Sequence, residues 1–161
     1  MNRIEPQLTS SKESAWLERL RPQLAKQQPF SLLSADQLSE LLSTAQLCKF
    51  KPGQKLVRSN ELGDSLFLVV QGSVRLIAIG DESEGQFTLG KRDSGYLVGW
   101  ASFLRGESCE LVQASTDVLA FSFSSKIFLK LIFDVQEFAN HYYSLASLQE
   151  SYAVLVASGE L

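Results

Sequence analysis

The chain has 161 residues, a net charge of −3 and 45% hydrophobic residues, enough apolar material for one substantial core. Its sequence pI of about 5.2 leaves no basic field to attract a nucleic acid or an anionic membrane. No apolar run approaches the roughly 18 residues of a membrane-spanning helix, and no secretory signal is present, so we expect a cytoplasmic chain without membrane insertion.

The N-terminal segment, residues 1–29, is predicted to form a helical arm. Within residues 13–26, ESAWLERLRPQLAK, apolar side chains recur at helical spacing: Trp16, Leu17, Leu20 and Leu24. Pro22 has no amide hydrogen, so it is expected to kink or interrupt this helix. A second helix is predicted after Pro29, with Ser34 as its N-cap. Its apolar face carries Leu38, Leu41 and Leu42.

From Gln46 to Phe123 the pattern changes to short apolar runs, broken about every eight to twelve residues by glycine or polar clusters. The runs are QLCKFK, QKLVR, SLFLVV, SVRLIAI, QFTLG, YLVG, ELVQAS and VLAFSF. This pattern predicts an α+β fold, with an antiparallel β-roll or jelly roll of about eight strands flanked by N-terminal and C-terminal helices. The acidic residues 81–85 are expected to form a solvated hairpin tip.

Helical spacing returns at the C-terminal end. Ser124 or Ser125 is the expected cap of a first helix. Residues 135–161 are predicted as a C-terminal helical unit, with one long helix from Val135 to Ala157. Its apolar stripe is Phe138, Tyr142, Leu145, Leu148, Tyr152 and Leu155. This stripe must pack on the roll as a lid, pair with a second copy, or lead into a longer chain.

Residues that carry catalytic or metal chemistry are sparse. Cys48 and Cys109 are far apart and form no zinc or disulfide pattern, so both thiols are expected to be buried. His141, the single histidine, has no neighbouring nucleophile and is expected to be a partly buried helical side chain. Phosphate-loop, zinc-protease and serine-hydrolase motifs are absent from the sequence. We therefore expect no enzymatic activity, no catalytic residue and no metal site.

The run FKPGQKLVRSNELGDSLFLVVQGSVRLIA, residues 50–78, resembles the cyclic nucleotide-binding domain family in its glycine pattern. Glycines at such corners have a physical reason, because positive φ or close backbone approach excludes a Cβ. The resemblance extends over roughly residues 30–145. It implies a nucleotide-binding-like roll over residues 30–134, including its flanking helices.

In that family a strand, a glycine, a short helix and an arginine hold the nucleotide. Residues 97–115, here called the cassette, align with this motif through Gly99-Trp100-Ala101-Ser102 and on to Arg105. The resemblance implies that backbone N–H groups of the short helix and an arginine meet the phosphate, while a glutamate after the glycine binds the ribose.

The cassette departs from the family at two places. Trp100 stands where the family has the ribose-binding glutamate, and Ser108-Cys109-Glu110 stands where it has proline and arginine. The candidate ligand-binding residues of this degenerate cassette are Gly99, Trp100, Ala101, Ser102, Arg105, Cys109 and Glu110.

These departures are expected to weaken nucleotide binding. Because a hydrogen bond to a charged group contributes about 1.5–3 kcal/mol, losing both groups costs roughly 3–6 kcal/mol, on the order of a hundred- to ten-thousand-fold in affinity. Glu110 adds repulsion if its side chain points inward. Arg105 is expected to be an exposed charge, the alternative being that it folds back toward an anion. Trp100 and Phe103 are expected to pack in the core, the alternative being that they stack on a flat ligand.

The favoured function is a non-enzymatic regulatory or docking module that keeps the fold of the family without its ligand chemistry. The alternative is a sensor of a cyclic nucleotide or another small effector, with the C-terminal helix as its lid. Under the favoured hypothesis no cofactor is bound, and the partners are a second copy or other domains reached through the C-terminal helix. A DNA-binding regulator is disfavoured because the sequence has no basic face.

The variant segment LRGESCELVQASTDVLAF, residues 104–121, is similar to N-terminal domains of cyanobacterial-type, peptidase-containing ABC exporters of toxins and processed peptides. This resemblance implies that the chain is the N-terminal cytoplasmic domain of a membrane transporter. Any ATPase or peptidase chemistry would then lie in other domains.

Overall fold

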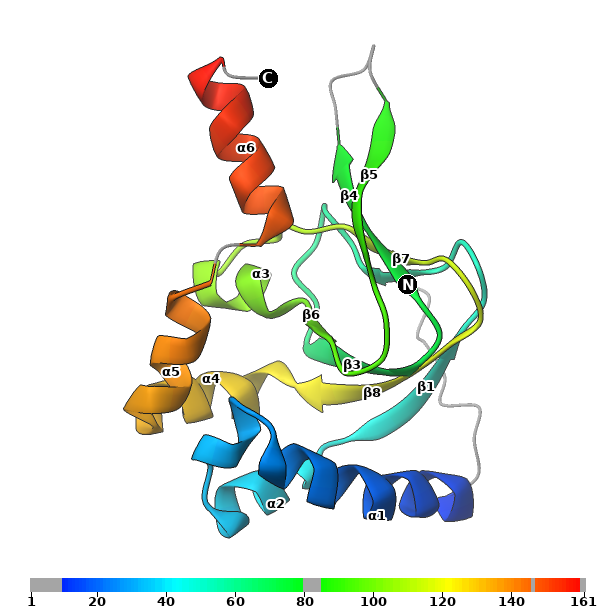
Figure 1. Cartoon of the computed structure of the whole chain (residues 1–161), viewed down its shortest axis with the longest axis vertical. Coiled ribbons are helices and arrows are strands. Elements are labelled where there is room, and N and C mark those ends of the chain that lie inside the picture. Colours follow the sequence, from blue (N-terminus) through cyan, green and yellow to red (C-terminus); the bar gives the residue numbers. More distant parts are fainter. Residues whose placement is uncertain (1–9, 80–84, 146, 160–161) are drawn as a thin grey trace.

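Two four-stranded antiparallel sheets form the centre of the molecule, and helices from both ends of the chain pack around them (Figure 1). The computed structural model describes residues 10–79, 85–145 and 147–159. Most of the 81–85 tip predicted above therefore lies outside the described residues. The α+β prediction with about eight antiparallel strands is confirmed.

The strand order of the first sheet is β1-β8-β3-β6, and that of the second is β2-β7-β4-β5. The first sheet contains β1 (Gln46–Phe50), β3 (Ser65–Gln71), β6 (Leu97–Val98) and β8 (Val118–Ser124). The second contains β2 (Lys55–Val57), β4 (Val74–Ile79), β5 (Gln86–Arg92) and β7 (Val112–Ala114).

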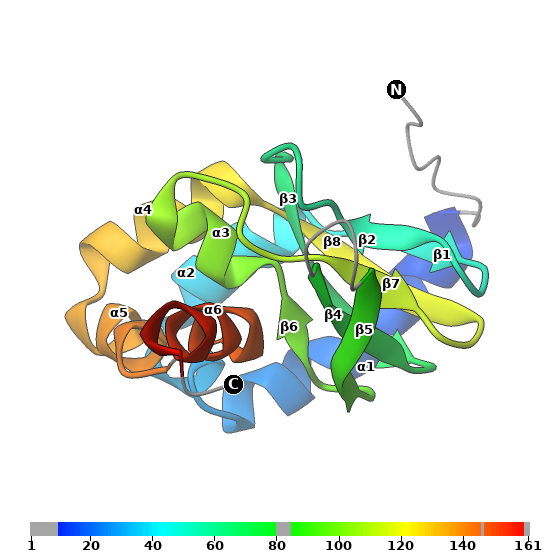
Figure 2. The ribbon, with the colours of Figure 1, turned by 90° about the horizontal axis from the view of Figure 1, so that it is seen from above.

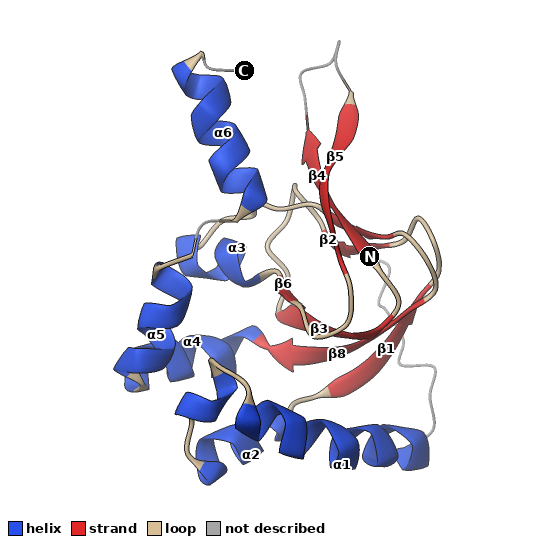
Figure 3. Ribbon diagram, in the orientation of Figure 1, coloured by secondary structure: helices blue, strands red, loops and turns tan. Residues whose placement is uncertain are grey.

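Alternation along the strands divides the core in two. In β3, Leu66 and Leu68 face the helices, while Phe67 and Val69 face the second sheet, because successive side chains of a strand point to opposite faces. The apolar cluster between the sheets, here called the roll interior, includes Phe50, Val74 and Val112. A separate cluster joins the outer face of the first sheet to the helices (Figure 3).

The N-terminal helices confirm one prediction and correct another. Ser34 caps α2 (Ala35–Ser43) in a full capping box with Gln37, as the sequence predicts. Helix α1 (Ser10–Lys26) runs through Pro22, so of the predicted kink or interruption the interruption is wrong. Pro22 lies on an exposed part of the helix, where the carbonyl group that it leaves without an amide partner is open to water. A 3₁₀ turn, Phe30–Leu32, joins the two helices.

The C-terminal unit corrects a further prediction. After α4 (Ser125–Asp134) the chain forms α5 (Gln136–Tyr143) and α6 (Leu148–Ser158) instead of one helix from Val135 to Ala157. The separation has a local cause, because the Ser147 hydroxyl accepts a hydrogen bond from Glu150 N at 3.1 Å and so starts a new helix. Ser124 occupies the N-cap position of α4 but makes no side-chain cap bond. Gly159 is the C-cap residue of α6.

An aromatic cluster fixes α5 against the rest of the molecule. Phe138 packs with Phe30, Phe128 and Tyr142 at ring-centroid distances of 6.2, 5.9 and 5.3 Å. Burial of such rings gives large hydrophobic stabilisation as well as specific edge-to-face geometry.

Within residues 10–79, 85–145 and 147–159, no helix has both the length and the apolar character needed to cross a bilayer.

Candidate functional site

The cassette begins with a sharp turn at Gly99. This residue has φ of 94° and precedes the short helix α3 (Trp100–Arg105). An added Cβ would be strained at that φ and would lie 3.3 Å from Val57 Cγ2. Gly99 also has no side chain with which to cap the helix, so the first N–H groups of α3 need another acceptor.

Glu110 supplies that acceptor. Its side chain is 4% exposed, and its Oε1 accepts a hydrogen bond of 3.0 Å from the backbone N–H of Ala101. An inward-pointing Glu110 is expected to repel an anion. The carboxyl group does point inward, and it occupies the helix N-terminus itself.

The protonation of Glu110 reflects two opposing effects. Burial raises its pKa to about 7, while backbone hydrogen bonds from Ala101, Ser102 and Gly99 lower it. The Glu150 carboxylate nearby raises it further. Near neutral pH the group therefore exchanges a proton, and in either protonation state its oxygen accepts from Ala101.

Ser108 and Cys109, which lie where the family has proline and arginine, form hydrogen bonds within the chain. The Ser108 hydroxyl donates to the carbonyl oxygen of Arg58. Cys109 N donates to Ser102 Oγ at 3.2 Å, and Cys109 Sγ lies 3.7 Å from the same hydroxyl. Burial raises the pKa of the Cys109 thiol, which keeps it protonated. The buried-thiol prediction is confirmed for Cys48, whereas Cys109 is only partly buried.

Arg105, the last residue of α3, is half exposed and is paired within the chain. Its guanidinium forms an ion pair with Glu150 of α6, with side-chain exposures of 50% and 16%. This contact joins the cassette to the C-terminal helix across 45 positions of sequence. Glu150 has no signal in the sequence, because residue spacing cannot show which surface carboxylate a distant arginine meets.

The aromatic residues of α3 pack within the protein. Phe103 is buried, as expected. Trp100 is partly buried, with its ring centroid 5.5 Å from that of Tyr142 in α5. His141 is also partly buried and lies beside Tyr142, in agreement with its prediction. Thus α3 contacts α5 through Trp100 and α6 through Arg105.

Helix α6 rises beside the β4–β5 hairpin and contacts both strands (Figure 1), and in the view from above it is seen end-on between α5 and β6 (Figure 2). Leu148 packs on the roll interior, and Tyr152 makes an edge-on contact with Phe87 at 5.1 Å. Gln149 is buried and its Nε2 donates to Leu111 O at 3.4 Å. Of the three arrangements considered for the C-terminal stripe, this part of α6 adopts packing on the roll.

Arg92 is a cation that the sequence analysis did not identify. Its guanidinium lies 4.8 Å over the centre of the Tyr96 ring, and Nη1 donates to Lys91 O at 2.8 Å. A Cβ on Gly90 would contact both Arg92 and Leu148, so Arg92 lies on the side of β5 that faces α6. Its Nε is buried without a hydrogen-bond partner in the described part of the chain.

Comparison with known proteins gives the family and the fold of the chain. The sequence profile of the family described as Cyclic nucleotide-binding domain matches residues 47–134. No curated protein sequence matches the chain.

Solved structures show the same fold. The regulatory subunit of a cAMP-independent protein kinase A from Trypanosoma brucei, a mutant bound to cAMP in the A site, is 20% identical with a TM-score of 0.71, covering 90% of this chain and 53% of that one. The sensor domain of the transcriptional regulator DNR from Pseudomonas aeruginosa is 21% identical with a TM-score of 0.66, covering 77% and 88%. Catabolite Activator Protein from Thermus thermophilus is 25% identical with a TM-score of 0.61, covering 84% and 61%. The chain spans about half the length of the kinase regulatory subunits it matches.

Proposed function

The chain belongs to the cyclic nucleotide-binding domain family, and from this premise we propose that it is a regulatory docking module whose phosphate position is filled by its own Glu110. The family consists of ligand-binding domains, and the chain is non-enzymatic. The observation that carries the proposal is the hydrogen bond from Ala101 N to Glu110 Oε1 at the start of α3. In the family, the corresponding N–H groups meet the phosphate of the nucleotide.

Two consequences of this arrangement disfavour nucleotide binding. The Glu110 carboxyl group takes the hydrogen-bond donor that a phosphate needs. When Glu110 is ionised, a phosphate about 4 Å away would be repelled by about 4 kcal/mol at an effective dielectric constant of 20. Arg105, the only arginine of the cassette, is already paired with Glu150.

The module holds α6 closed with contacts from its own chain. Leu148 on the roll interior and the Arg105–Glu150 ion pair do so without a ligand. The outer part of α6 carries exposed apolar side chains, Val154, Leu155 and Val156. This face supports a role for the C-terminal helix in docking to a second copy or to another domain.

One related structure supports an experiment on the missing arginine. It is a triple mutant of a cAMP-independent regulatory subunit bound to cAMP, and one of its substitutions replaces a threonine with arginine. A comparable change here is Ser108→Arg combined with Glu110→Ala. Ser108 lies in the segment that stands where the family has proline and arginine, and the alanine at position 110 frees the N–H of Ala101.

Thermal denaturation with millimolar cAMP or cGMP tests the proposal. We expect no stabilisation of the natural chain and a measurable cAMP-dependent stabilisation of the double variant. Ser108→Lys with Glu110→Ala is the matched control, because lysine restores the charge without the two-pronged geometry of arginine. Stabilisation of the natural chain, which reaches about 2.7 kcal/mol at a ligand concentration of 100 Kd, would contradict the proposal.

Arg92 favours a second candidate function, a sensor for a small anionic effector. Its guanidinium faces α6, and its Nε lacks a partner among the described residues, so an anion entering between β5 and α6 would meet a positive group. Arg92→Gln distinguishes this candidate. Under the sensor hypothesis, Arg92→Gln abolishes the stabilisation that an anionic ligand gives to the natural chain. Under the docking hypothesis, the melting temperature measured with the ligand is the same for the variant and for the natural chain.

We also propose that the chain is the N-terminal cytoplasmic domain of a peptidase-containing ABC exporter. This proposal is supported by the resemblance of residues 104–121 to such domains. The open reading frame that encodes the chain is then expected to continue into membrane-spanning and ATP-binding segments. Sequencing past the codon of Leu161 checks this, and a stop codon there would contradict it.

A further inference from the structure

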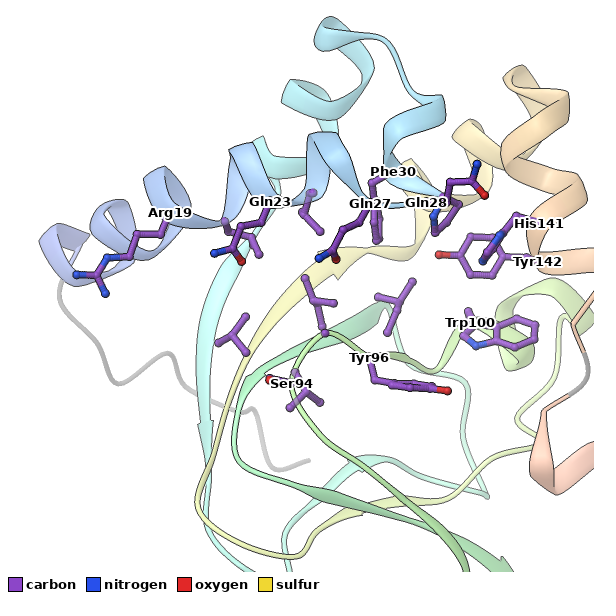
Figure 4. A pocket seen from close by; sticks show the side chains of 18 of the residues that line it. Arg19, Gln23, Gln27, Gln28, Phe30, Ser94, Tyr96, Trp100, His141 and Tyr142 are labelled. Carbon is purple, nitrogen blue, oxygen red and sulfur yellow. The ribbon is translucent and has the colours of Figure 1, made fainter.

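A cleft lined in part by Trp100 lies outside the helix cap made by Glu110, because neither Ala101 nor Glu110 lines it. It runs between α1, the segment before β6 and the end of α5, and it has a volume of about 570 Å³ (Figure 4). Leu20, Leu24 and Leu68 form part of its apolar floor. At Leu68 the cleft lies on the outer face of the first sheet, and it also reaches Val69 of the roll interior.

The two long walls of the cleft differ in chemistry. Helix α1 contributes Arg19 and Gln23, which lie on one face because they are four positions apart, and Gln27 follows directly after the last residue of the helix. The opposite side is aromatic, with Tyr96, Trp100 and Tyr142. Figure 4 shows Arg19 at one end of the cleft and His141 at the other, with the glutamine side chains between them.

The charge of the cleft has one sign. Of the described residues that line it, none is an aspartate or a glutamate, while Arg19 carries a positive charge. Sites of this volume accept small organic ligands, which are usually bound by apolar walls with a few polar groups for orientation. Aromatic side chains stack well on flat rings, and a guanidinium pairs with an acidic group.

We propose that this cleft is a second binding site, which takes a flat aromatic molecule carrying a single negative charge. The aromatic wall and leucine floor hold the ring system, the glutamine amides hydrogen-bond to its polar edge, and Arg19 pairs with its carboxylate or sulfonate. This site does not depend on the function proposed for the cassette.

A ligand in the cleft would contact two elements that report on the cassette. Trp100 is the first residue of α3, and its ring packs against Tyr142 of α5. A ring bound beside these two side chains would restrict the Trp100–Tyr142 contact, through which α3 and α5 meet.

The chain offers a site-specific optical test, because it has two tryptophans and both Trp16 and Trp100 line the cleft. Anilinonaphthalene sulfonate is a flat aromatic anion that accepts excitation energy from nearby tryptophan. Titrated into the intact protein, it is expected to show saturable tryptophan-excited emission with one molecule bound per chain. The uncharged phenylnaphthylamine is the matched probe for the contribution of charge.

Three substitutions on α1 locate the probe. Arg19→Gln is expected to weaken the sulfonate by about five-fold, the effect of an exposed ion pair worth about 1 kcal/mol, and to leave the neutral probe unchanged. Gln23→Phe fills the cleft and weakens both probes. Lys26→Gln, which removes a charge of the same helix outside the cleft, weakens neither. Circular dichroism confirms that each variant has the unfolding curve of the natural chain.

Three outcomes would overturn the proposal. The first is sulfonate binding that is equal in the natural chain, Arg19→Gln and Gln23→Phe, which would place the probe elsewhere. The second is the absence of tryptophan-excited emission. The third is a dimer, observed by sedimentation, that binds the probe only after dilution has separated its two chains. This result would mean that a second copy of the chain occupies the cleft. Addition of cAMP is not expected to displace the probe, so this test and that of the cassette fail independently.

Discussion

The cassette and the cleft along α1 meet at Trp100 and treat negative charge in opposite ways. In the cassette, the N-terminus of α3 is capped by a buried carboxyl group of the same chain, Glu110. In the cleft, Arg19 carries a positive charge and no carboxylate is found among the described lining residues. Under the two proposals made above, the phosphate position of the family is filled by the chain itself, and a different surface binds an acidic molecule.

The cassette lacks the arginine that is typical of the family, yet the N-terminus of α3 is not left without an acceptor, because Glu110 supplies one. A short helix keeps unpaired N–H groups at its start whether or not a ligand is present. An acceptor that reaches them from within the chain satisfies them permanently and makes the helix independent of a ligand. Glu110 reaches α3 from the connection between α3 and β7, nine positions after Ala101.

The pH dependence of stability gives the largest expected effect on this contrast. Because the pKa of Glu110 is raised from 4.5 to about 7, the folded state binds this proton more tightly than the unfolded state. The resulting stabilisation is complete below about pH 4.5 and is lost as the pH rises to about 7. At pH 8, Glu110→Gln is expected to raise the free energy of unfolding by up to about 3 kcal/mol relative to the natural chain, from 1.36 kcal/mol per pKa unit.

Urea denaturation of both chains between pH 4 and pH 8 measures this difference. Glu107→Gln is the matched control, because Glu107 is exposed in the same connection, and its curve should follow that of the natural chain. Parallel curves for Glu110→Gln and the natural chain would mean that the carboxyl group is not held at α3. The contrast between a filled cassette and an open cleft would then disappear.

The fold followed from local sequence signals. The strands of the roll alternate between two apolar clusters, and glycine or polar clusters separate the runs, so each strand was visible in a short window. The start of α6 also has a signal in the sequence. Ser147 and Glu150 have the spacing of a helix cap, which marks a new helix inside the apparently continuous stripe.

The site could be predicted only in part. The sequence shows which family residues are missing, but not that Glu110 turns inward to cap α3, since that depends on the path of the connection. Arg105 and Glu150 lie 45 positions apart, and the cleft combines α1 with α5. Such long-range pairings arise from tertiary packing, which residue spacing alone does not reveal.

The Arg105–Glu150 ion pair gives the smaller expected effect and tests whether the cassette controls α6. Because Arg105 is half exposed, Arg105→Ala is expected to lower global stability by no more than about 1 kcal/mol. Its local effect is larger, since this pair and the Leu148 contact hold α6 on the roll. Amide hydrogen exchange is therefore expected to quicken in α6 and to stay unchanged in α1 beside the cleft.

Glu150→Gln should give the same pattern, and the double variant should add little to either. Lys130→Ala, which breaks the separate pair with Glu40, serves as the control. If exchange in α6 is as slow in Arg105→Ala as in Lys130→Ala, the apolar contacts alone hold the helix, and the cassette has no electrostatic hold on the C-terminal docking face.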